Sequence, residues 1–279
     1  MSVMRVPVRG GELAVEVVEG STEPVLAVHG ISSHRRLWDW LRIEAPELSL
    51  LAPDLRGRAD SFGVEGPSSL AQHVEDLVAV LDAARLPSVH VCGMSMGGFV
   101  AVELALRHPE RVKSLVLVDG GYPMAVPPGL TREALPAVFA DRLARLDHTW
   151  GSVEELAAFF TTGTGPLLDP HDPVLLGYLA HDLDADGRVR LSGQVLLDDA
   201  ADIFFGENRW DQLALPVRYL AAEWSVGEGS PPAYPAAALE QIRPKTVRTV
   251  VVPGVDHAAS IMSKAGAAVT AELLSQALA

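Results

Sequence analysis

The fold is decided by residues 89–98, which read Val-His-Val-Cys-Gly-Met-Ser-Met-Gly-Gly. An apolar run ends there in a Gly-x-Ser-x-Gly pattern around Ser95, and a helical pattern follows over 96–107. A serine on so tight a turn from strand to helix is held in a strained conformation, and its second neighbours on both sides must be small. The turn exposes the serine oxygen above the carboxyl ends of a parallel sheet. The segment therefore predicts a nucleophilic serine at the edge of the sheet.

Short apolar runs rich in valine and leucine recur along the chain without polar alternation. Such runs are typical of strands buried on both faces of a parallel sheet. Residues 3–9 and 12–18 alternate instead around Gly10-Gly11, the pattern of a β-hairpin. The buried runs are 25–28, 48–52, 88–92, 114–118, 217–221 and 247–252, and helical patterns lie at 69–85, 96–107 and 259–278. Together they predict an α/β fold with a mostly parallel eight-stranded sheet flanked by helices.

A long helical stretch interrupts this alternation between Val118 and Val217. Its helical patterns lie at 131–146, 152–161, 173–181 and 194–205. A connection of this length is an inserted subdomain rather than a loop. We expect a core domain made of residues 1–121 and 211–279, with a helical cap, or lid, over 122–210. Twelve acidic residues and four arginines give residues 141–202 a charge of −8.

Charge and cysteine content exclude several classes of function. The chain has 22 basic and 36 acidic residues, a formal charge of −14, which repels nucleic acids and anionic membranes. A single cysteine permits neither an internal disulfide bond nor a cysteine-based zinc site, and the HExxH pattern is missing, so we expect no metal. The first residues do not have the pattern of a signal peptide. We expect a cytoplasmic protein, a monomer or homodimer, with a small-molecule substrate and with no nucleic-acid or membrane partner.

A serine nucleophile needs a base within hydrogen-bond reach, and His257 is the expected base. Residues 250–257 read Val-Val-Val-Pro-Gly-Val-Asp-His, so His257 follows the last expected strand and precedes the final helix. This places it on a loop at the same edge of the sheet as Ser95. The other histidines that we weighed as bases lie in helical patterns or in the insertion.

Backbone amides at two positions are expected to bind the oxyanion of an acyl-transfer reaction. Met96 provides one at the start of its helix. Ile31, in the loop Val28-His29-Gly30-Ile31 after an early strand, provides the other. We expect His29 to support this loop at the substrate pocket without transferring protons, and we place Trp38 and Trp224 in the lining of that pocket.

These motifs together resemble the α/β-hydrolase superfamily of serine esterases with a cap domain. The residues that carry the resemblance are His29-Gly30, Asp54–Ser61 (DLRGRADS), the nucleophile elbow at 93–98, Leu115–Asp119 and Gly254–His257. The resemblance covers essentially the whole chain. It implies a Ser-His-acid catalytic triad, no cofactor, and a pocket roofed by the cap.

The acid of that triad is where the sequence departs from the family. Most members carry an aspartate after the penultimate strand, and this position is Ser225 here. Asp119, at the end of the strand after the elbow helix, is our first choice, because some members use that position. Glu228 is the alternative acid, and Glu223 lies at the strand end. Asp256 is excluded, because it cannot easily present its carboxylate to the far nitrogen of the adjacent His257.

The sequence therefore predicts a hydrolase of the carboxylesterase type, acting on a carboxylic ester or related acyl bond through an acyl-enzyme. Alternatives are a cofactor-free perhydrolase or C–C bond hydrolase with the same triad, and a non-hydrolytic binding protein that keeps the fold. The missing acid at Ser225 motivates the last of these. From the acidic cap we also expect neutral or cationic esters to be preferred over anionic ones.

Overall fold

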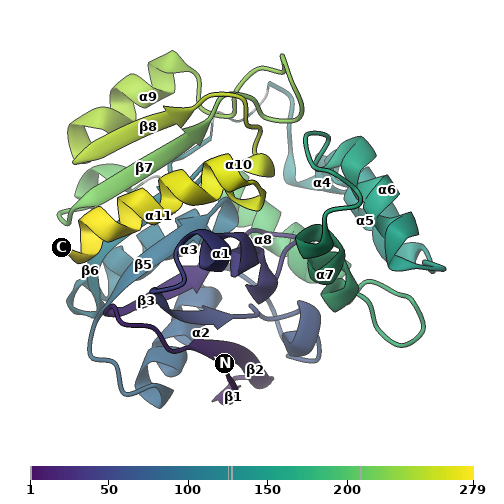
Figure 1. Cartoon of the computed structure of the whole chain (residues 1–279), viewed down its shortest axis with the longest axis horizontal. Helices are drawn as coiled ribbons and strands as arrows, with labels where there is room; N and C mark the ends of the chain where they lie inside the picture. Colours follow the sequence, from purple (N-terminus) through teal and green to yellow (C-terminus); the bar gives the residue numbers. More distant parts are fainter. Residues whose placement is uncertain (1, 125, 127, 208) are drawn as a thin grey trace.

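The computed structural model describes residues 2–124, 126, 128–207 and 209–279. Its centre is an eight-stranded sheet with the strand order β1-β2-β4-β3-β5-β6-β7-β8 (Figure 1). The hairpin β1–β2 and the β2–β4 pair are antiparallel, and every pairing from β4 onward is parallel. The strands are β1 (Ser2–Val8), β2 (Gly11–Val18), β3 (Pro24–Val28), β4 (Ser49–Pro53), β5 (Val89–Met94), β6 (Val112–Val118), β7 (Val217–Ala222) and β8 (Arg248–Val252). The predicted fold class is confirmed.

Two hydrophobic clusters lie on opposite faces of the sheet, because successive residues of a strand point to opposite sides. In β3, Val25 and Ala27 belong to one cluster, while Leu26 and Val28 belong to the other. The first face is covered by α1 (Asp39–Glu44), α10 (Ala259–Met262) and α11 (Lys264–Leu278). The second is covered by α2 (Leu70–Ala83), α3 (Met96–Arg107) and α9 (Ala236–Ile242). Burial on both faces explains why the central strands show no polar alternation.

Between β6 and β7 the described residues form several helices joined by turns, and we call residues 122–210 the helical insert. Helices α4 to α7 gather at one side of the sheet, at the right of the view (Figure 1). The insert contains η4 (Arg132–Ala134), α4 (Leu135–Val138), α5 (Ala140–Asp147), α6 (Val153–Gly163), α7 (Pro173–Asp182) and α8 (Gly193–Phe205). It is joined to the core by an isolated bridge between Arg58 and Leu191. Among the described residues, no helix has both the length and the apolar character needed to cross a membrane.

Candidate active site

Ser95 occupies the turn between β5 and α3 in a strained backbone conformation. Its φ and ψ angles are 54° and −121°, and its N–H donates to the Val118 carbonyl at 2.9 Å. A Cβ atom added at Gly97 would lie 1.9 Å from the Val28 oxygen, and one added at Gly93 would lie 2.3 Å from the Gly97 oxygen. Glycine is therefore required at both positions. This packing holds the Ser95 side chain at the carboxyl edge of the sheet.

His257 reaches Ser95 from the loop between β8 and α10. Its Nε2 atom lies 3.0 Å from Ser95 Oγ, and its backbone N–H donates to the Ser225 carbonyl at 3.3 Å. Asp256 does not contact the imidazole; its carboxylate accepts N–H groups from Ala259 and Gly227, each at 2.9 Å. Asp256 thus binds the N–H of the first residue of α10 and one N–H of the loop after β7, while the imidazole faces the serine.

The carboxylate on the other side of the imidazole is that of Asp119. Its Oδ2 lies 2.6 Å from His257 Nδ1, and its Oδ1 accepts the Ala222 N–H at 3.0 Å. The side chain is 1% exposed, and the backbone has a φ of 45°. The carboxylate holds the proton on Nδ1, which leaves Nε2 free to accept the Ser95 hydroxyl proton. The three side chains form one hydrogen-bonded chain.

The other two carboxylates considered as the triad acid point elsewhere. Glu228 is exposed. Glu223 accepts the Gly254 N–H at 2.7 Å and so fastens the turn after β8. Ser225, which stands where the family resemblance implied an aspartate, lines the cavity beside His257. Of the acids weighed from the sequence, Asp119 is the one in contact with the imidazole.

The loop expected to bind the oxyanion is fixed from behind by Arg58. Its guanidinium donates to the Ile31 carbonyl from Nε at 3.1 Å and from Nη2 at 2.8 Å. Nη2 also contacts the Met96 sulfur at 3.8 Å and donates to Asp199 of α8 at 2.6 Å. The sequence did not single out Arg58 or Asp199 for a role, although Arg58 lies in the DLRGRADS segment. This buried pair links the insert to both expected oxyanion positions.

His29 also stabilises this loop, through two hydrogen bonds to backbone groups. It is fully buried; its Nδ1–H donates to the Gly30 carbonyl at 2.8 Å, and its Nε2 accepts the Leu55 N–H at 3.0 Å. Burial, aided by the charge of Arg58, lowers the pKa of His29 to about 3. The ring is therefore neutral at physiological pH and holds the loop without exchanging protons.

A cavity of about 300 Å³ opens over Ser95 and His257, between the core and the insert. Its lining includes Ile31 and Met96 from the core and, from the insert, Phe139, Arg142, Phe160, Tyr178 and Phe204. The three residues that we placed in the pocket from the sequence are not among its described lining residues. His29 is buried below the loop, and Trp38 is 1% exposed within the hydrophobic core. The backbone N–H of Trp224 donates to the Val255 carbonyl at 3.2 Å. Apolar side chains of the insert take their place.

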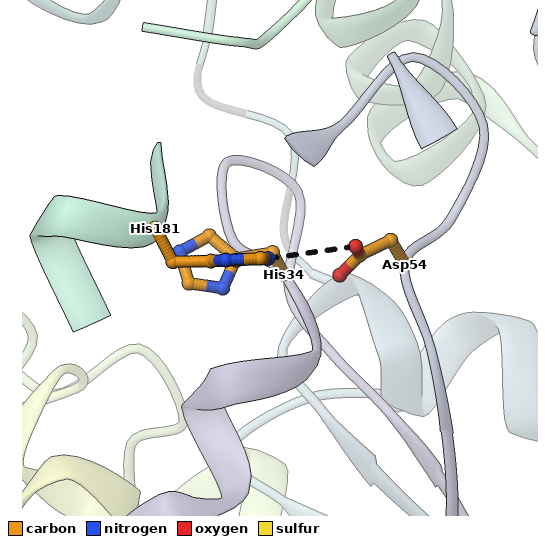
Figure 2. Close-up of side chains that lie close together, drawn as sticks. All are labelled: His34, Asp54 and His181. Atoms are coloured by element: carbon orange, nitrogen blue, oxygen red, sulfur yellow. Dashed lines mark ion pairs between the residues drawn. The ribbon is translucent and has the colours of Figure 1, made fainter. Parts of the chain in front are cut away.

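One other cluster has the residue types of a metal site. His34, Asp54 and His181 bring potential ligand atoms within 4.8 Å of one another (Figure 2). However, Asp54 Oδ1 already accepts the Arg35 N–H at 2.8 Å, and Oδ2 is paired with the Arg35 guanidinium. A divalent cation bound to this carboxylate would be repelled by the positive charge of the Arg35 guanidinium. The donor set does not fit a resident metal.

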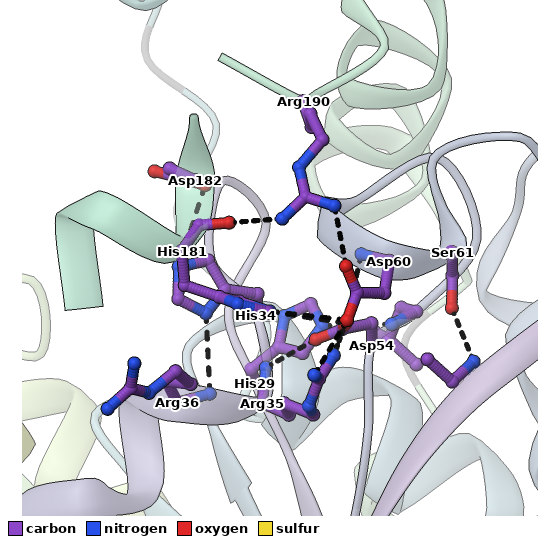
Figure 3. A network of polar contacts seen from close by, with 12 residues as sticks. His29, His34, Arg35, Arg36, Asp54, Asp60, Ser61, His181, Asp182 and Arg190 are labelled. Atoms are coloured by element: carbon purple, nitrogen blue, oxygen red, sulfur yellow. Dashed lines mark hydrogen bonds and ion pairs between the residues drawn. The ribbon is translucent and has the colours of Figure 1, made fainter. Parts of the chain in front are cut away.

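The same cluster belongs to a polar network between the core and the insert (Figure 3). Arg190 pairs with Asp60 of the core at 2.5 Å and donates to the His181 carbonyl at 2.6 Å. His34 Nδ1 accepts the Arg36 N–H at 3.3 Å, which places its proton on Nε2, 3.6 Å from Asp182. The network therefore joins the two parts of the chain.

Comparisons with known proteins agree with this architecture. Residues 25–272 match the model of the alpha/beta hydrolase family. The chain is 34% identical over 145 residues to the lipase LipV of Mycobacterium tuberculosis, over 52% of this chain and 54% of the lipase. It is 35% identical over 121 residues to a 2-hydroxymuconate semialdehyde hydrolase of Pseudomonas sp., over 40% of this chain and 41% of that protein. The matches thus span about half or less of these relatives' lengths.

The crystal structure of E-2-(acetamidomethylene)succinate hydrolase shares the fold, with a TM-score of 0.77 at 22% identity over 99% of this chain and 98% of that one. The chain belongs to the alpha/beta hydrolase family.

Proposed function

We propose that the protein is a serine hydrolase that cleaves a carboxylic ester or a related acyl bond of a small molecule. The observation that carries this proposal is the hydrogen-bonded chain Ser95–His257–Asp119 at the wall of the cavity. A hydroxyl, a base and an orienting carboxylate in this geometry are what nucleophilic acyl transfer requires.

In the first half-reaction, Ser95 Oγ attacks the carbonyl carbon while His257 Nε2 takes the hydroxyl proton. The carbonyl oxygen becomes an oxyanion, stabilised by the Ile31 and Met96 amides; one such donor contributes roughly 10²–10³ in rate. The intermediate then expels the alcohol, whose oxygen receives the proton from His257. This leaves the acyl group on Ser95.

In the second half-reaction, water attacks the acyl carbon and gives one proton to His257 Nε2. The new tetrahedral intermediate releases Ser95 Oγ, which takes that proton back. One water is consumed, and a carboxylic acid and an alcohol are released. Throughout, Asp119 holds the His257 ring in the required tautomer and stabilises its protonated form. The sequence suggested a non-hydrolytic role because Ser225 stands where an acid was expected; the contact of Asp119 with the His257 imidazole supports the hydrolytic proposal instead.

A fluorophosphonate probe and an activated ester test this proposal. We expect stoichiometric labelling of Ser95 and a burst of 4-nitrophenol from a 4-nitrophenyl ester. Ser95→Ala should abolish both. Ser275→Ala, at an exposed serine of α11, is the matched control and should behave as the native protein. Absence of labelling in the native protein would contradict the proposal and favour a binding function.

A further inference from the structure

Arg142 places a positive charge on the wall of the cavity. It belongs to α5 of the helical insert and lines the same cavity as Ser95 and His257. Arg145, three residues on, lies on the same face of the helix. Arg145 is buried against the core, where it donates to the Ser32 carbonyl at 3.4 Å. Arg142, one turn earlier, borders the cavity itself.

Arg142 differs from three other buried arginines in forming no ion pair, although the charge of the adjacent, exposed Asp141 acts on it at longer range. Arg56 pairs with Asp76 at 2.8 Å, Arg58 pairs with Asp199 at 2.6 Å, and Arg145 lies 3.8 Å from Asp182. Within the described part of the chain, Arg142 forms no ion pair or hydrogen bond; its guanidinium lies 5.5 Å from the centre of the Phe139 ring. Half-buried charges are ordinarily paired. Among the described residues no carboxylate lies within ion-pair distance of Arg142, so its N–H donors remain available to an anion in the cavity.

The surroundings of Arg142 strengthen its attraction for an anion. Burial and the charge of Arg145 lower the pKa of Arg142 and outweigh the opposing charge of Asp141, but a guanidinium stays protonated at neutral pH. The described lining of the cavity contains one carboxylate, that of Asp119, which is already hydrogen-bonded to His257. Apolar side chains make up most of the remaining wall. A carboxylate brought into this cavity would meet a partly desolvated cation with free N–H donors.

We propose that Arg142 is a specificity-determining residue that binds a carboxylate of the substrate, remote from the bond that Ser95 attacks. The substrate class is then that of small carboxylate-bearing acyl compounds such as half-esters of dicarboxylic acids. This inference rests on the proposed function for the reaction, but not for the binding.

The proposal reverses the preference expected from the overall charge of the insert. That expectation used the surface potential, which acts on the approach of a substrate and is screened over about 10 Å at 0.1 M salt. Arg142 acts inside the cavity, where direct contact determines affinity. The preference of the site therefore follows the local arginine rather than the net charge.

Matched ester pairs test the role of Arg142 in specificity. Each pair consists of the 4-nitrophenyl half-ester of succinate, glutarate or adipate and the neutral 4-nitrophenyl methyl diester of the same acid. We expect the native protein to prefer the anionic member of a pair in kcat/KM. Arg142→Met should lower that preference by about 10- to 100-fold, mainly through a higher KM for the anionic ester.

The control is Arg132→Met, because Arg132 is not among the described lining residues of the cavity. The substitution removes the same charge and a similar contact, since the Arg132 guanidinium lies 5.2 Å from the centre of the Phe205 ring. It should retain the preference. Arg142→Gln replaces Arg142→Met if the latter loses activity on neutral esters. An unchanged preference in both Arg142 variants, or an equal loss in Arg132→Met, would overturn the inference.

A binding measurement separates this inference from the proposed reaction. In a Ser95→Ala background, glutarate should raise the thermal unfolding midpoint, and Arg142→Met should remove that shift. Failure of the native protein to react with a fluorophosphonate would refute the hydrolase proposal, whereas Arg142-dependent glutarate binding would survive it. Normal labelling together with glutarate binding that ignores Arg142 would refute the inference alone.

Discussion

At the scale of single residues, the acid at the end of β6 is the feature that distinguishes this site. The left-handed backbone of Asp119, with a φ of 45°, is strained for a residue with a side chain, and such strain is found at functional positions. Its carboxylate bridges the Ala222 amide and the His257 imidazole. The residue thereby joins β7 to the loop that carries His257.

Replacing this carboxylate should therefore remove most of the activity. We expect Asp119→Asn to lower kcat for a 4-nitrophenyl ester by about 10³- to 10⁴-fold, because the amide favours the wrong imidazole tautomer. Glu228→Gln makes the same chemical change at an exposed carboxylate and should keep the native rate. Steady-state kinetics with both variants show which of the two carboxylates is the triad acid. Native activity in Asp119→Asn would refute the assignment of Asp119.

At the scale of elements, a helix of the insert is tied to the loop after β3 through one arginine. Arg58 links Asp199 of α8 to the Ile31 carbonyl, and Asp199 is also held by Ser68 at 2.6 Å and by His73 at 3.0 Å. Fixing the Ile31 carbonyl restricts the backbone rotation of Ile31 and so limits the movement of its N–H, the expected oxyanion donor. Arg58 is a positioning residue.

A lysine at this position cannot reproduce the forked contact. We expect Arg58→Lys to lower kcat by about tenfold or more with little change in KM, since misplaced oxyanion donors weaken the transition state rather than substrate binding. Arg56→Lys is the control, because Arg56 is equally buried but paired with Asp76, away from Ile31. It should lower the unfolding temperature and leave kcat near the native value. Equal losses of kcat in the two variants would indicate a general structural effect.

The sequence predicted the elements with strong periodicity and missed those without it. All eight strands lie within two residues of the predicted runs, because burial on both faces makes their patterns distinct. Helices α1 and α9 escaped notice, since six or seven residues give less than two turns of periodicity. The pattern at 259–278 is two helices, because Ser263 takes an extended conformation and caps α11 through Gly266.

The candidate site was predictable where it depends on chain order and not where it depends on packing. Ser95 and His257 follow from their places after strands, and the structure brings them together. The choice between Asp119 and Glu228 as the triad acid depends on the conformation of the loop after β7, which the sequence pattern does not show. Trp38 was misplaced because an aromatic in the core and one in a pocket have the same sequence pattern. The role proposed for Arg142 could not be predicted, because the sequence does not show which arginines line the cavity or which form ion pairs.

At the scale of the whole molecule, the core and the insert meet at a buried carboxylate with few hydrogen bonds. Asp182, at the end of α7, is 3% exposed, and its Oδ2 has no hydrogen-bond partner among the described residues. It faces His34 at 3.6 Å and Arg145 at 3.8 Å, with His181, Arg190 and Asp54 also nearby. Burial raises its pKa to about 6 and outweighs the opposing charge of Arg145. Burial also lowers the pKa of His34, which stays neutral.

This raised pKa predicts how the stability of the molecule depends on pH. In the unfolded chain Asp182 binds a proton only near its ordinary pKa of 3.8, whereas in the folded protein it does so near 6. Between these values the folded state binds more protons, so the contribution of Asp182 to stability is present below pH 4 and is lost as the pH rises through 6. The shift of about two units corresponds to about 3 kcal/mol. Asp182→Asn removes this dependence, because an amide does not titrate.

Urea unfolding of the native protein and of Asp182→Asn at a series of pH values measures the difference directly. We expect the free energy of unfolding of the native protein, relative to that of the variant, to fall by up to about 3 kcal/mol between pH 4 and pH 8. Titrating groups that do not interact with Asp182 are common to both proteins and cancel in the difference. Asp186→Asn, at an exposed residue of the loop that follows α7, is the matched control for the removal of one carboxylate from this region. A flat profile for Asp182→Asn, or one of opposite slope, would mean that the ionised carboxylate is stabilised by Arg145 and the neighbouring cations more than burial disfavours it.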